Sequence, residues 1–303
     1  MKPLFLALGC FLSLHNPLRA VETTNSPFEG VRYILRRDVP KAEVSARDTA
    51  ADKESKEKIP PQTARPLTVD IVEIDLRTPG LRFLVTPPTP GGPKGDETKT
   101  QTTRDFVAQH KAQIGINGGF YRLENGRESR WTNNLSLAAS NGVIYSPFEI
   151  VKEKFEYAIN ISKDNRASII RLGEADPASI YNAIAGSEPI LLNGKNVAKW
   201  LELHPRTAVG INREGTKLFL CVVDGRQPTH SMGMTTPELA EMLRGYGAWN
   251  AINLDGGGSS TMVFDLYGDK DANGQEIGPI LVNKLSGERF NGTNLAVFIP
   301  MRQ

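Results

Sequence analysis

Residues 249–264 read W-N-A-I-N-L-D-G-G-G-S-S-T-M-V-F, and this stretch carries most of the information about the fold and the site. The apolar residues Ala251, Ile252 and Leu254 are typical of a short buried strand that ends at Asp255. Glycines at the next three positions let the backbone adopt positive φ and let a ligand approach its N–H groups: Gly256, Gly257 and Gly258. Hydroxyl side chains follow at Ser259, Ser260 and Thr261. The stretch therefore predicts a carboxylate, bare backbone and hydroxyls gathered in one turn at a strand end.

An ordinary hairpin turn also uses glycines, so turn geometry alone would explain the same run. Two other glycine motifs are excluded. A Walker loop needs a Lys after its last glycine, and none follows here. A nucleophile elbow needs a Gly two residues after its serine, which neither Ser259 nor Ser260 has. NTP hydrolysis and α/β-hydrolase chemistry are therefore not supported.

The N-terminus predicts export. Residues 1–20 combine Lys2, an apolar run over 4–14 and a small Ala20, which is typical of a secretory signal peptide cleaved before Val21. We expect a secreted or periplasmic protein with no integral membrane segment after cleavage, since the run is too short to cross a bilayer. Lipid anchoring through Cys10, in a faint lipoprotein box, is the less favoured alternative.

Composition argues against nucleic acid as a partner. The chain has 303 residues with 36 Lys and Arg against 34 Asp and Glu, and the predicted signal peptide contains two basic and no acidic residues. The mature chain is then neutral and has no excess of positive charge to neutralise phosphates. Only Cys221 lies beyond the signal, so we expect no disulfide within the chain and a thiol buried in a strand. Composition sets no oligomeric state.

The remaining pattern predicts an α+β fold with mixed, mostly antiparallel sheets, a few packed helices and a single catalytic domain. We divide the chain into a signal peptide (1–20), an N-terminal strand with a polar excursion or linker (21–66) and a catalytic domain (67–303). The strand covers 28–35, and the charged excursion covers 36–65. Helices are predicted at about 103–112 and 236–246, the second of which starts at Thr236, Pro237 and Glu238.

Polar residues lie beside glycines or strand ends in three other places. These are Asn117 with Gly118 and Gly119, Arg206 with Thr207, and Asp224 with Arg226. Such positions present side chains to a ligand from a rigid scaffold. Guanidinium groups suit phosphate, and aspartates suit acid–base or nucleophilic chemistry. The arginines would equally serve in ordinary ion pairs.

The order of these motifs resembles that of the phosphodiester glycosidase family. The motifs are I-N-G-G-F-Y (116–121), P-R-T-A-V-G-I (205–211), V-V-D-G-R (222–226), T-T-P-E-L-A-E-M-L (235–243) and N-L-D-G-G-G-S-S-T-M (253–262). The resemblance covers about residues 67–299, where a late Glu288-Arg289 followed by N-L-A-V is similar to the family's closing strand. Two departures are the polar excursion and the single mature cysteine.

The resemblance implies a hydrolase that cleaves a sugar, an N-acetylhexosamine, from a sugar-1-phosphodiester at the anomeric carbon. The substrate would be a phosphodiester-linked exported or cell-surface glycan, and neither a cofactor nor a metal is expected. Glycosidases usually need two carboxylates, one of them a general acid. Phosphate leaves more easily than an alcohol, so neutralisation by arginine can replace part of that acid.

Roles follow from this hypothesis. Asp255 is the base or nucleophile, with Asp224 as second carboxylate or orienter and Glu188 as the alternative. Arg206 and Arg226 are predicted to hold the phosphate, and residues 256–260 would complete its binding site with N–H and hydroxyl groups. Thr207 is assigned to substrate binding beside Arg206. The side-chain amide of Asn117, next to Gly118 and Gly119, would bind a sugar hydroxyl or acetamido group. His204 and His230 are expected to be loop residues, because no metal-binding spacing surrounds them.

Two other functions fit the same residues. One is a non-catalytic cell-wall or exopolysaccharide binding protein on the same scaffold, which would leave the aspartates and arginines without a chemical task. The other is a glycosidase acting on an unphosphorylated sugar. That enzyme would need a strong general acid and would leave the arginines unused.

Overall fold

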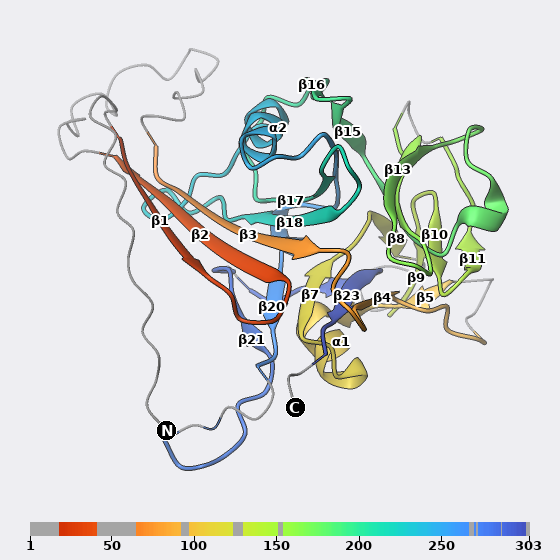
Figure 1. Ribbon diagram of the computed structural model, residues 1–303, viewed down its shortest axis with the longest axis horizontal. Helices are drawn as coiled ribbons and strands as arrows, with labels where there is room; N and C mark the ends of the chain where they lie inside the picture. The colour runs from red at the N-terminus through yellow and green to blue at the C-terminus, as the bar shows by residue number, and fades with distance from the viewer. Residues whose placement is uncertain are drawn as a thin grey trace.

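An eight-stranded antiparallel sheet forms the middle layer of the computed structural model (Figure 1). The structure describes residues 18–40, 65–91, 97–123, 130–150, 154–266, 270, 272–285 and 287–300. From edge to edge the strands are β1 (Leu18–Asn25), β2 (Val31–Pro40), β3 (Leu67–Asp75), β18 (Lys217–Val223), β17 (Arg206–Ile211), β19 (Asn250–Asn253), β15 (Glu188–Leu192) and β16 (Lys195–Asn196).

Strand β18 shows why this sheet lies in the middle. Its sequence K-L-F-L-C-V-V is apolar on both faces, which is typical of a strand covered on both sides. Leu218, Leu220 and Val222 belong to one core cluster, shared with Ile114 and Ile116 of another sheet. The alternate side chains belong to a second cluster with the helix residues Leu239 and Leu243: Phe219, Cys221 and Val223. The predicted buried thiol of Cys221 is therefore confirmed.

Two five-stranded antiparallel sheets complete the framework. One contains β11 (Val143–Ser146), β10 (Ala138–Ser140), β14 (Asn182–Gly186), β12 (Tyr157–Ile161) and β13 (Ala167–Arg171). The other contains β21 (Ile280–Leu281), β20 (Met262–Phe264), β7 (Ile114–Asn117), β23 (Asn294–Phe298) and β4 (Arg82–Val85). Smaller pairings join β22 (Phe290–Asn291) to β6 (Gln101–Thr102), and β9 (Trp131–Asn134) to both β5 (Thr98–Lys99) and β8 (Tyr121–Leu123).

Two α-helices and two short 3-10 helices accompany the sheets in the described residues. Helix α1 (Thr103–His110) packs on β7, β20 and β23, and α2 (Thr236–Gly245) packs on β15, β16 and β19. A capping box between Thr235 and Glu238, with Pro237 in the first turn, starts α2. The 3-10 helices are η3 (Pro177–Ser179) and η4 (Gly257–Ser259). Helix η4 lies inside the glycine run.

The fold class is confirmed only broadly, because sheet dominates over helix. Every pairing between named strands of the described chain is antiparallel, so the sheets are not mixed. Within the described part of the chain, no helix has the length and apolarity needed to span a membrane. Most of the predicted signal peptide lies outside the described residues, and residues 18–20 begin β1.

The structure differs from the predicted polar excursion (36–65) at both ends of that segment. Strand β2 continues to Pro40, because it pairs with β1 as far as Pro40 and with β3 as far as Asp38. Within it Arg36 Nε donates to Asp38 Oδ1 at 3.0 Å. At the other end Arg65 is fully buried, and its guanidinium pairs with Glu238 in the first turn of α2. Residues 41–64 lie outside the described residues.

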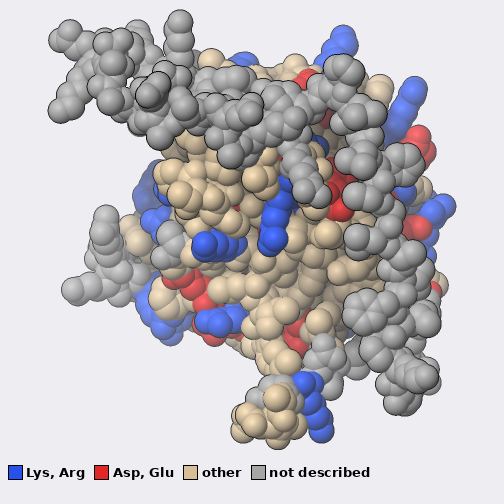
Figure 2. Space-filling view, turned by 90° about the vertical axis from the view of Figure 1, so that its left-hand side faces the viewer, with Lys and Arg blue, Asp and Glu red and all other residues tan. Residues whose placement is uncertain are grey.

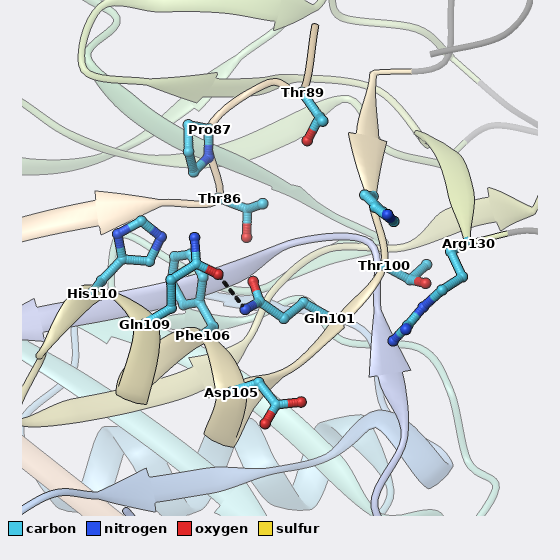
Figure 3. A pocket seen from close by; sticks show the side chains of 11 residues that line it. Thr86, Pro87, Thr89, Thr100, Gln101, Asp105, Phe106, Gln109, His110 and Arg130 are labelled. Carbon is cyan, nitrogen blue, oxygen red and sulfur yellow. Dashed lines mark hydrogen bonds between the residues drawn. The ribbon is translucent and has the colours of Figure 1, made fainter. Parts of the chain in front are cut away.

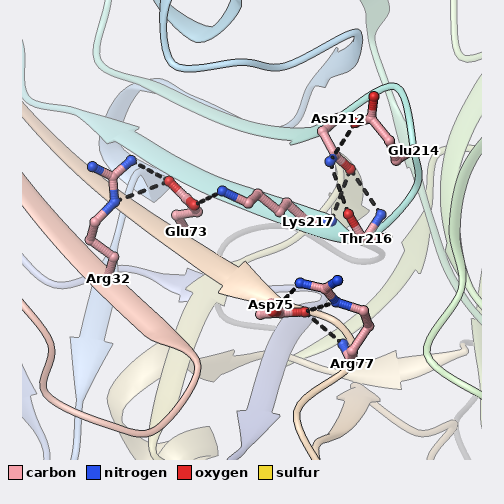
Figure 4. A network of polar contacts seen from close by, with 8 residues as sticks. All are labelled: Arg32, Glu73, Asp75, Arg77, Asn212, Glu214, Thr216 and Lys217. Carbon is pink, nitrogen blue, oxygen red and sulfur yellow. Dashed lines mark hydrogen bonds and ion pairs between the residues drawn. The ribbon is translucent and has the colours of Figure 1, made fainter.

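Ion pairs tie three adjacent strands together at the end of β18 that starts with Lys217. Glu73 on β3 accepts hydrogen bonds from Arg32 on β2 and from Lys217 on β18 (Figure 4). The face seen in Figure 2 likewise shows basic and acidic side chains interspersed among the described residues. The opposite end of these strands, beyond Val223, carries the candidate site.

Candidate active site

Strand register brings the predicted polar residues to the same side of the eight-stranded sheet, where β18 and β19 end and β17 begins. Arg206 pairs with Val223, and Ala208 pairs with Asn253. Asp224 follows the last residue of β18, and Asp255 lies just beyond the end of β19. In adjacent antiparallel strands the end of one strand lies beside the beginning of the next, so both aspartates lie beside the beginning of β17.

Asn117, the last residue of β7, joins the five-stranded sheet that contains β7 to these strand ends. Its Nδ2 donates to the carbonyl of Asp255 at 2.7 Å, and its Oδ1 accepts from Thr207 Oγ1 at 2.7 Å and from Thr261 N–H at 3.1 Å. Asn117 and Thr207 are both fully buried. The backbones of residues 206, 224 and 255 therefore lie at neighbouring strand ends, and Asn117 is bonded to the backbone of Asp255. Asn117 and Thr207 are buried behind these ends and hold them together.

The glycines after Asn117 allow close packing between sheets. The N–H groups of Gly118 and Gly119 donate to the carbonyl and hydroxyl of Thr293 at 2.8 and 2.9 Å. A Cβ on Gly119 would lie 2.8 Å from the carbonyl oxygen of Ala185. These N–H groups are thus already occupied, so the structure does not place them in contact with a substrate.

The glycine run after Asp255 is a tight turn packed beneath two arginines. Gly257 has φ +63°, and its N–H donates to the carbonyl of Pro205 at 2.9 Å. A Cβ on Gly257 would be 3.2 Å from Arg226 Nη1, and one on Gly258 would be 3.3 Å from Arg289 Nη1. Two solvent-exposed guanidinium groups therefore rest directly on this backbone.

Asp255 has the perturbed titration expected of a catalytic carboxyl group. Burial raises the pKa of Asp255 to about 6, although the Ser259 hydroxyl, the Gly256 N–H and the Arg289 guanidinium each lower it. The Ser259 hydroxyl lies close enough to Asp255 to lower this pKa, although its geometry does not meet the criteria for a hydrogen bond. A pKa in this range lets one group both take up and release a proton near neutral pH.

Asp224 is surrounded by donors. Its carboxylate accepts from Asn283 Nδ2 and from the Lys284 N–H, both at 3.1 Å, and contacts His230 Nε2 at 2.7 Å. The side chain is 2% exposed. Asn283 Nδ2 also donates to the carbonyl of Ser260 at 3.1 Å. Asp224 therefore fixes residues 283–284 against the glycine turn.

A small cavity of about 20 Å³ lies between the glycine turn and the 283–287 segment, with room for about one water molecule. Asp224, Gly257, Gly258 and Ser260 contribute to its lining. The hydroxyls of Ser259 and Ser260 are buried and have no hydrogen-bond partner in the described part of the chain. Their hydrogen-bonding capacity is therefore unused within the described part of the chain.

Arg206 differs from the other arginines. It is 3% exposed, its Nε donates to the carbonyl of Met234 at 3.0 Å, and its Nη2 donates to the carbonyl of Glu202 at 2.7 Å. Burial lowers the pKa of Arg206, and the nearby Glu188 and Glu202 oppose that effect. Its guanidinium thus holds the loop before β17, while Arg226 is open to solvent.

Glu188 lies in a separate pocket. Its Oε1 accepts from Thr236 Oγ1 at 2.7 Å, and burial raises its pKa. The pocket has a volume of about 450 Å³, and neither Asp255 nor the glycine turn lines it. Glu188 still lies close enough to Arg206 for the guanidinium to lower its pKa.

Three side chains at the site were not predicted. Arg289 lies over Gly258 and lowers the pKa of Asp255. Tyr121 donates to the carbonyl of Phe290 at 2.6 Å, and burial together with Asp255 raises its pKa. His204 Nδ1 lies 3.3 Å from Arg226 Nη2, and burial lowers the pKa of His204. Arg289 and Tyr121 stand in the quoted motifs, but no pattern marked them apart from their neighbours.

His204 lies beside the guanidinium group of Arg226. Burial and the nearby guanidinium groups of Arg206 and Arg226 keep the pKa of His204 below the usual value for histidine, while Glu202 and a hydrogen bond with the Leu203 backbone oppose that effect. The neutral imidazole is thus the favoured form beside these two cations.

Another pocket lies away from these residues. About 350 Å³ in volume, it opens between α1 and residues 86–89, with Arg130 on the opposite side (Figure 3). Gln101 Nε2 donates to Gln109 Oε1 at 2.7 Å within it. None of the predicted site residues lines this pocket, so its size does not identify it as the reaction centre.

Comparison with known proteins identifies the family of the chain. A family model described as phosphodiester glycosidase matches residues 110–297. The N-acetylglucosamine-1-phosphodiester alpha-N-acetylglucosaminidase of Mus musculus is 29% identical over 199 residues, and that of Bos taurus is 30% identical over 196. Each match covers 58% of this chain and 36% of the relative, so the chain corresponds to about a third of those proteins.

Solved structures share the fold. The zebrafish catalytic domain of N-acetylglucosamine-1-phosphodiester alpha-N-acetylglucosaminidase, auto-inhibited by its pro-peptide, has a TM-score of 0.55 at 20% identity and covers 93% of this chain and 88% of its own. A Burkholderia pseudomallei K96243 protein, provisionally described as exported, has a TM-score of 0.61 at 14% identity, with coverages of 93% and 96%. At these identities the likeness concerns the fold.

Proposed function

Since this chain belongs to the phosphodiester glycosidase family, we propose that it hydrolyses a sugar-1-phosphodiester at the anomeric carbon. The sugar is an N-acetylhexosamine, and the products are the free sugar and a phosphomonoester. The observation that carries the proposal is the pair Arg226 and Arg289, whose guanidinium groups lie on the glycine turn next to Asp255.

Phosphate recognition follows from this pair. Exposed guanidinium groups supply planar pairs of N–H donors that match phosphate oxygens. The glycines have no side chains, which leaves room for the phosphate to contact both arginines. The buried hydroxyls of Ser259 and Ser260 add donors on the same turn. In this proposal Arg289 takes the phosphate-binding role that the sequence assigned to Arg206.

Asp255 acts on the anomeric carbon. Above its pKa of about 6 the carboxylate is ionised, and it either attacks C1 or removes a proton from the attacking water. The bond between C1 and the phosphodiester oxygen breaks, and its electron pair leaves with the phosphate. Arg226 and Arg289 neutralise the charge that develops on the leaving group, so the demand for a general acid is small.

The remaining predicted residues have positioning roles. Asp224 fixes the 283–284 segment, and Asn117 ties the Asp255 carbonyl to Thr207 and Thr261. Arg206 holds the loop that carries His204. Their burial supports roles behind the reaction centre. Loss of any of them would displace Asp255 or Arg226 from working geometry.

The setting of the substrate is also part of the proposal. The signal-like residues 1–20 support secretion, and an exported enzyme of this specificity would meet phosphodiester-linked glycans of the cell surface. The balanced charge of the chain fits a substrate with isolated phosphodiesters better than it fits a dense polyanion.

One assay separates this function from its alternatives. Release of N-acetylglucosamine is measured from its methyl 1-phosphodiester and from its nitrophenyl glycoside, with wild type and Asp255→Asn. We expect hydrolysis of the phosphodiester alone, and its loss in the variant. Cleavage of the aryl glycoside alone would favour an ordinary glycosidase, and cleavage of neither would favour a binding protein.

A further inference from the structure

The pocket around Trp200 has the composition of a carbohydrate site. Its volume of about 450 Å³ falls in the range of pockets that enclose small ligands. Trp200 and Tyr157 contribute aromatic surface, and Lys154, Lys199 and Glu188 contribute hydrogen-bonding groups. Aromatic walls with a few polar groups suit a pyranose ring, whose faces carry C–H bonds and whose rim carries hydroxyls.

The aromatic surface is held in place. Lys154 Nζ lies 3.9 Å from the centroid of the Trp200 indole ring. The backbone N–H of Trp200 donates to Thr236 Oγ1 at 3.0 Å, and its carbonyl accepts from the Thr236 N–H at 2.9 Å. The backbone of Trp200 is therefore fixed at the start of α2, and Lys154 packs against its ring.

Charge in the pocket favours a neutral ligand. Two lysines and two glutamates line it, Lys154 and Lys199 with Glu156 and Glu188. Glu156 is already paired with Arg171 at 3.2 Å. Positive and negative side chains are thus interspersed around the pocket, in contrast to the two arginines over the glycine turn.

Two connections join the pocket to residues that support the reaction centre from behind. Trp200 and Arg206 are six positions apart, so their Cα atoms lie no more than about 22 Å from each other. On the other side Phe155, which lines the pocket, packs edge-on against Phe120 at 5.4 Å, and Phe120 is adjacent to Gly119. Glu188 itself is within electrostatic reach of Arg206.

We propose that this pocket is a second saccharide subsite, which binds a neutral sugar unit of an extended glycan whose phosphodiester lies at the glycine turn. The inference rests on the proposed function and deepens it, because it makes the preferred substrate an oligosaccharide. Glu188, expected from the sequence to take part in catalysis, then accepts a hydrogen bond from a sugar hydroxyl together with the one from Thr236.

A binding experiment tests the subsite without using catalysis. The full chain carrying Asp255→Asn is titrated calorimetrically with two neutral tetrasaccharides, one of N-acetylglucosamine and one of glucose. We expect at least one of them to bind, and Trp200→Ala to weaken that binding about tenfold. Trp200→Phe should restore part of it, which also controls for folding.

The matched control is Arg213→Ala, which removes the cation lying 5.0 Å from the Trp249 ring, a pair outside this pocket. It should leave the affinity unchanged. Equal affinity in Trp200→Ala and in the parent protein, or no binding of either tetrasaccharide, overturns the subsite.

Kinetics separate the two proposals. In wild type the ratio of kcat/KM for an oligosaccharide phosphodiester to kcat/KM for the methyl phosphodiester should exceed one, and Trp200→Ala should lower that ratio about tenfold. Failure to hydrolyse either compound would overturn the proposed function while the titration still decides the subsite. Hydrolysis of both with an unaltered ratio in Trp200→Ala overturns the subsite alone.

Discussion

Arg289 lies directly over Gly258: a Cβ built on that glycine would be 3.3 Å from Arg289 Nη1 and 3.4 Å from its Cδ. Arg226 has the same relation to Gly257, with Nη1 at 3.2 Å. Two cations from separate segments therefore share the surface of one turn, next to the carboxyl group of Asp255. A Cβ on either glycine would crowd the guanidinium group above it and force that group to shift by a few tenths of an ångström, and the φ of +63° at Gly257 itself favours glycine.

The glycines of the turn should respond differently to alanine. In Gly258→Ala the new methyl group pushes on the flexible end of Arg289, so we expect a fall of about tenfold in kcat/KM with little change in Tm. In Gly256→Ala the methyl group would lie 2.7 Å from the Pro205 carbonyl oxygen. That backbone atom cannot move freely, so Tm should fall.

Gly278→Ala is the matched control for both, since nothing lies within 4 Å of its Cβ position. Activity assays and thermal melts of the three variants check the prediction. Equal losses of Tm in Gly256→Ala and Gly258→Ala would contradict the distinction.

Removal of the Arg289 guanidinium should impair turnover. We expect Arg289→Ala to lower kcat on the phosphodiester by roughly 100-fold or more, because the leaving phosphate loses one of its two cations. Arg289→Lys should recover only part of the rate, since an ammonium lacks the planar fork. Arg244→Ala, which removes an exposed arginine paired with Glu241 on α2, serves as the control. Full activity in Arg289→Ala would refute the assignment.

Activity should increase as pH rises through about 6. The proposed base or nucleophile is ionised Asp255, whose pKa burial raises to about 6. A plot of log kcat/KM against pH should therefore rise with unit slope below this value and level off above it. Arg289 lowers that pKa, so the rising part of the pH profile should move to higher pH in Arg289→Lys or Arg289→Ala if residual activity permits measurement. A decrease through the same range would instead make Asp255 a proton donor.

The buried carboxyl group should also weaken the fold at neutral pH. Its folded pKa of about 6 exceeds the ordinary 3.8. Stability linked to this group is thus fully present below about pH 4 and is lost as pH rises through 6. Asp255→Asn should therefore be more stable than wild type at pH 7.5, by on the order of 2 kcal/mol, and nearly equal to it at pH 3.5. Denaturant titrations at the two pH values measure this, and an equal difference at both would contradict it.

Asn117 should matter for folding as much as for activity. Its side chain joins Thr207, Thr261 and the carbonyl of Asp255 in a fully buried position. Asn117→Ala leaves three buried polar groups unpaired, so we expect a loss of roughly 3 kcal/mol or more in stability. Thermal melts should show a lower Tm, unlike Arg289→Ala. A variant with normal Tm and a raised KM would instead indicate direct contact with the sugar.

Several features follow from the sequence alone, because they depend on local pattern. Apolar runs such as 251–254 and 217–223 specify strands, and the polar residue after each run marks where the strand stops. Thr235, Pro237 and Glu238 specify the start of α2 through capping. The ordered set of five motifs was enough to indicate the family. Asp255 and the glycine run were identified because residue type alone gives their chemistry.

Which polar groups face the ligand was decided only by tertiary structure. Arg206, Arg226 and Arg289 have the same chemistry in the sequence, yet Arg206 is buried against the carbonyls of Met234 and Glu202, while the other two rest on the glycine turn. Asn117 was expected at the sugar and lies instead between two sheets. Exposure and hydrogen-bond partners come from segments distant along the chain, and a local pattern cannot specify them.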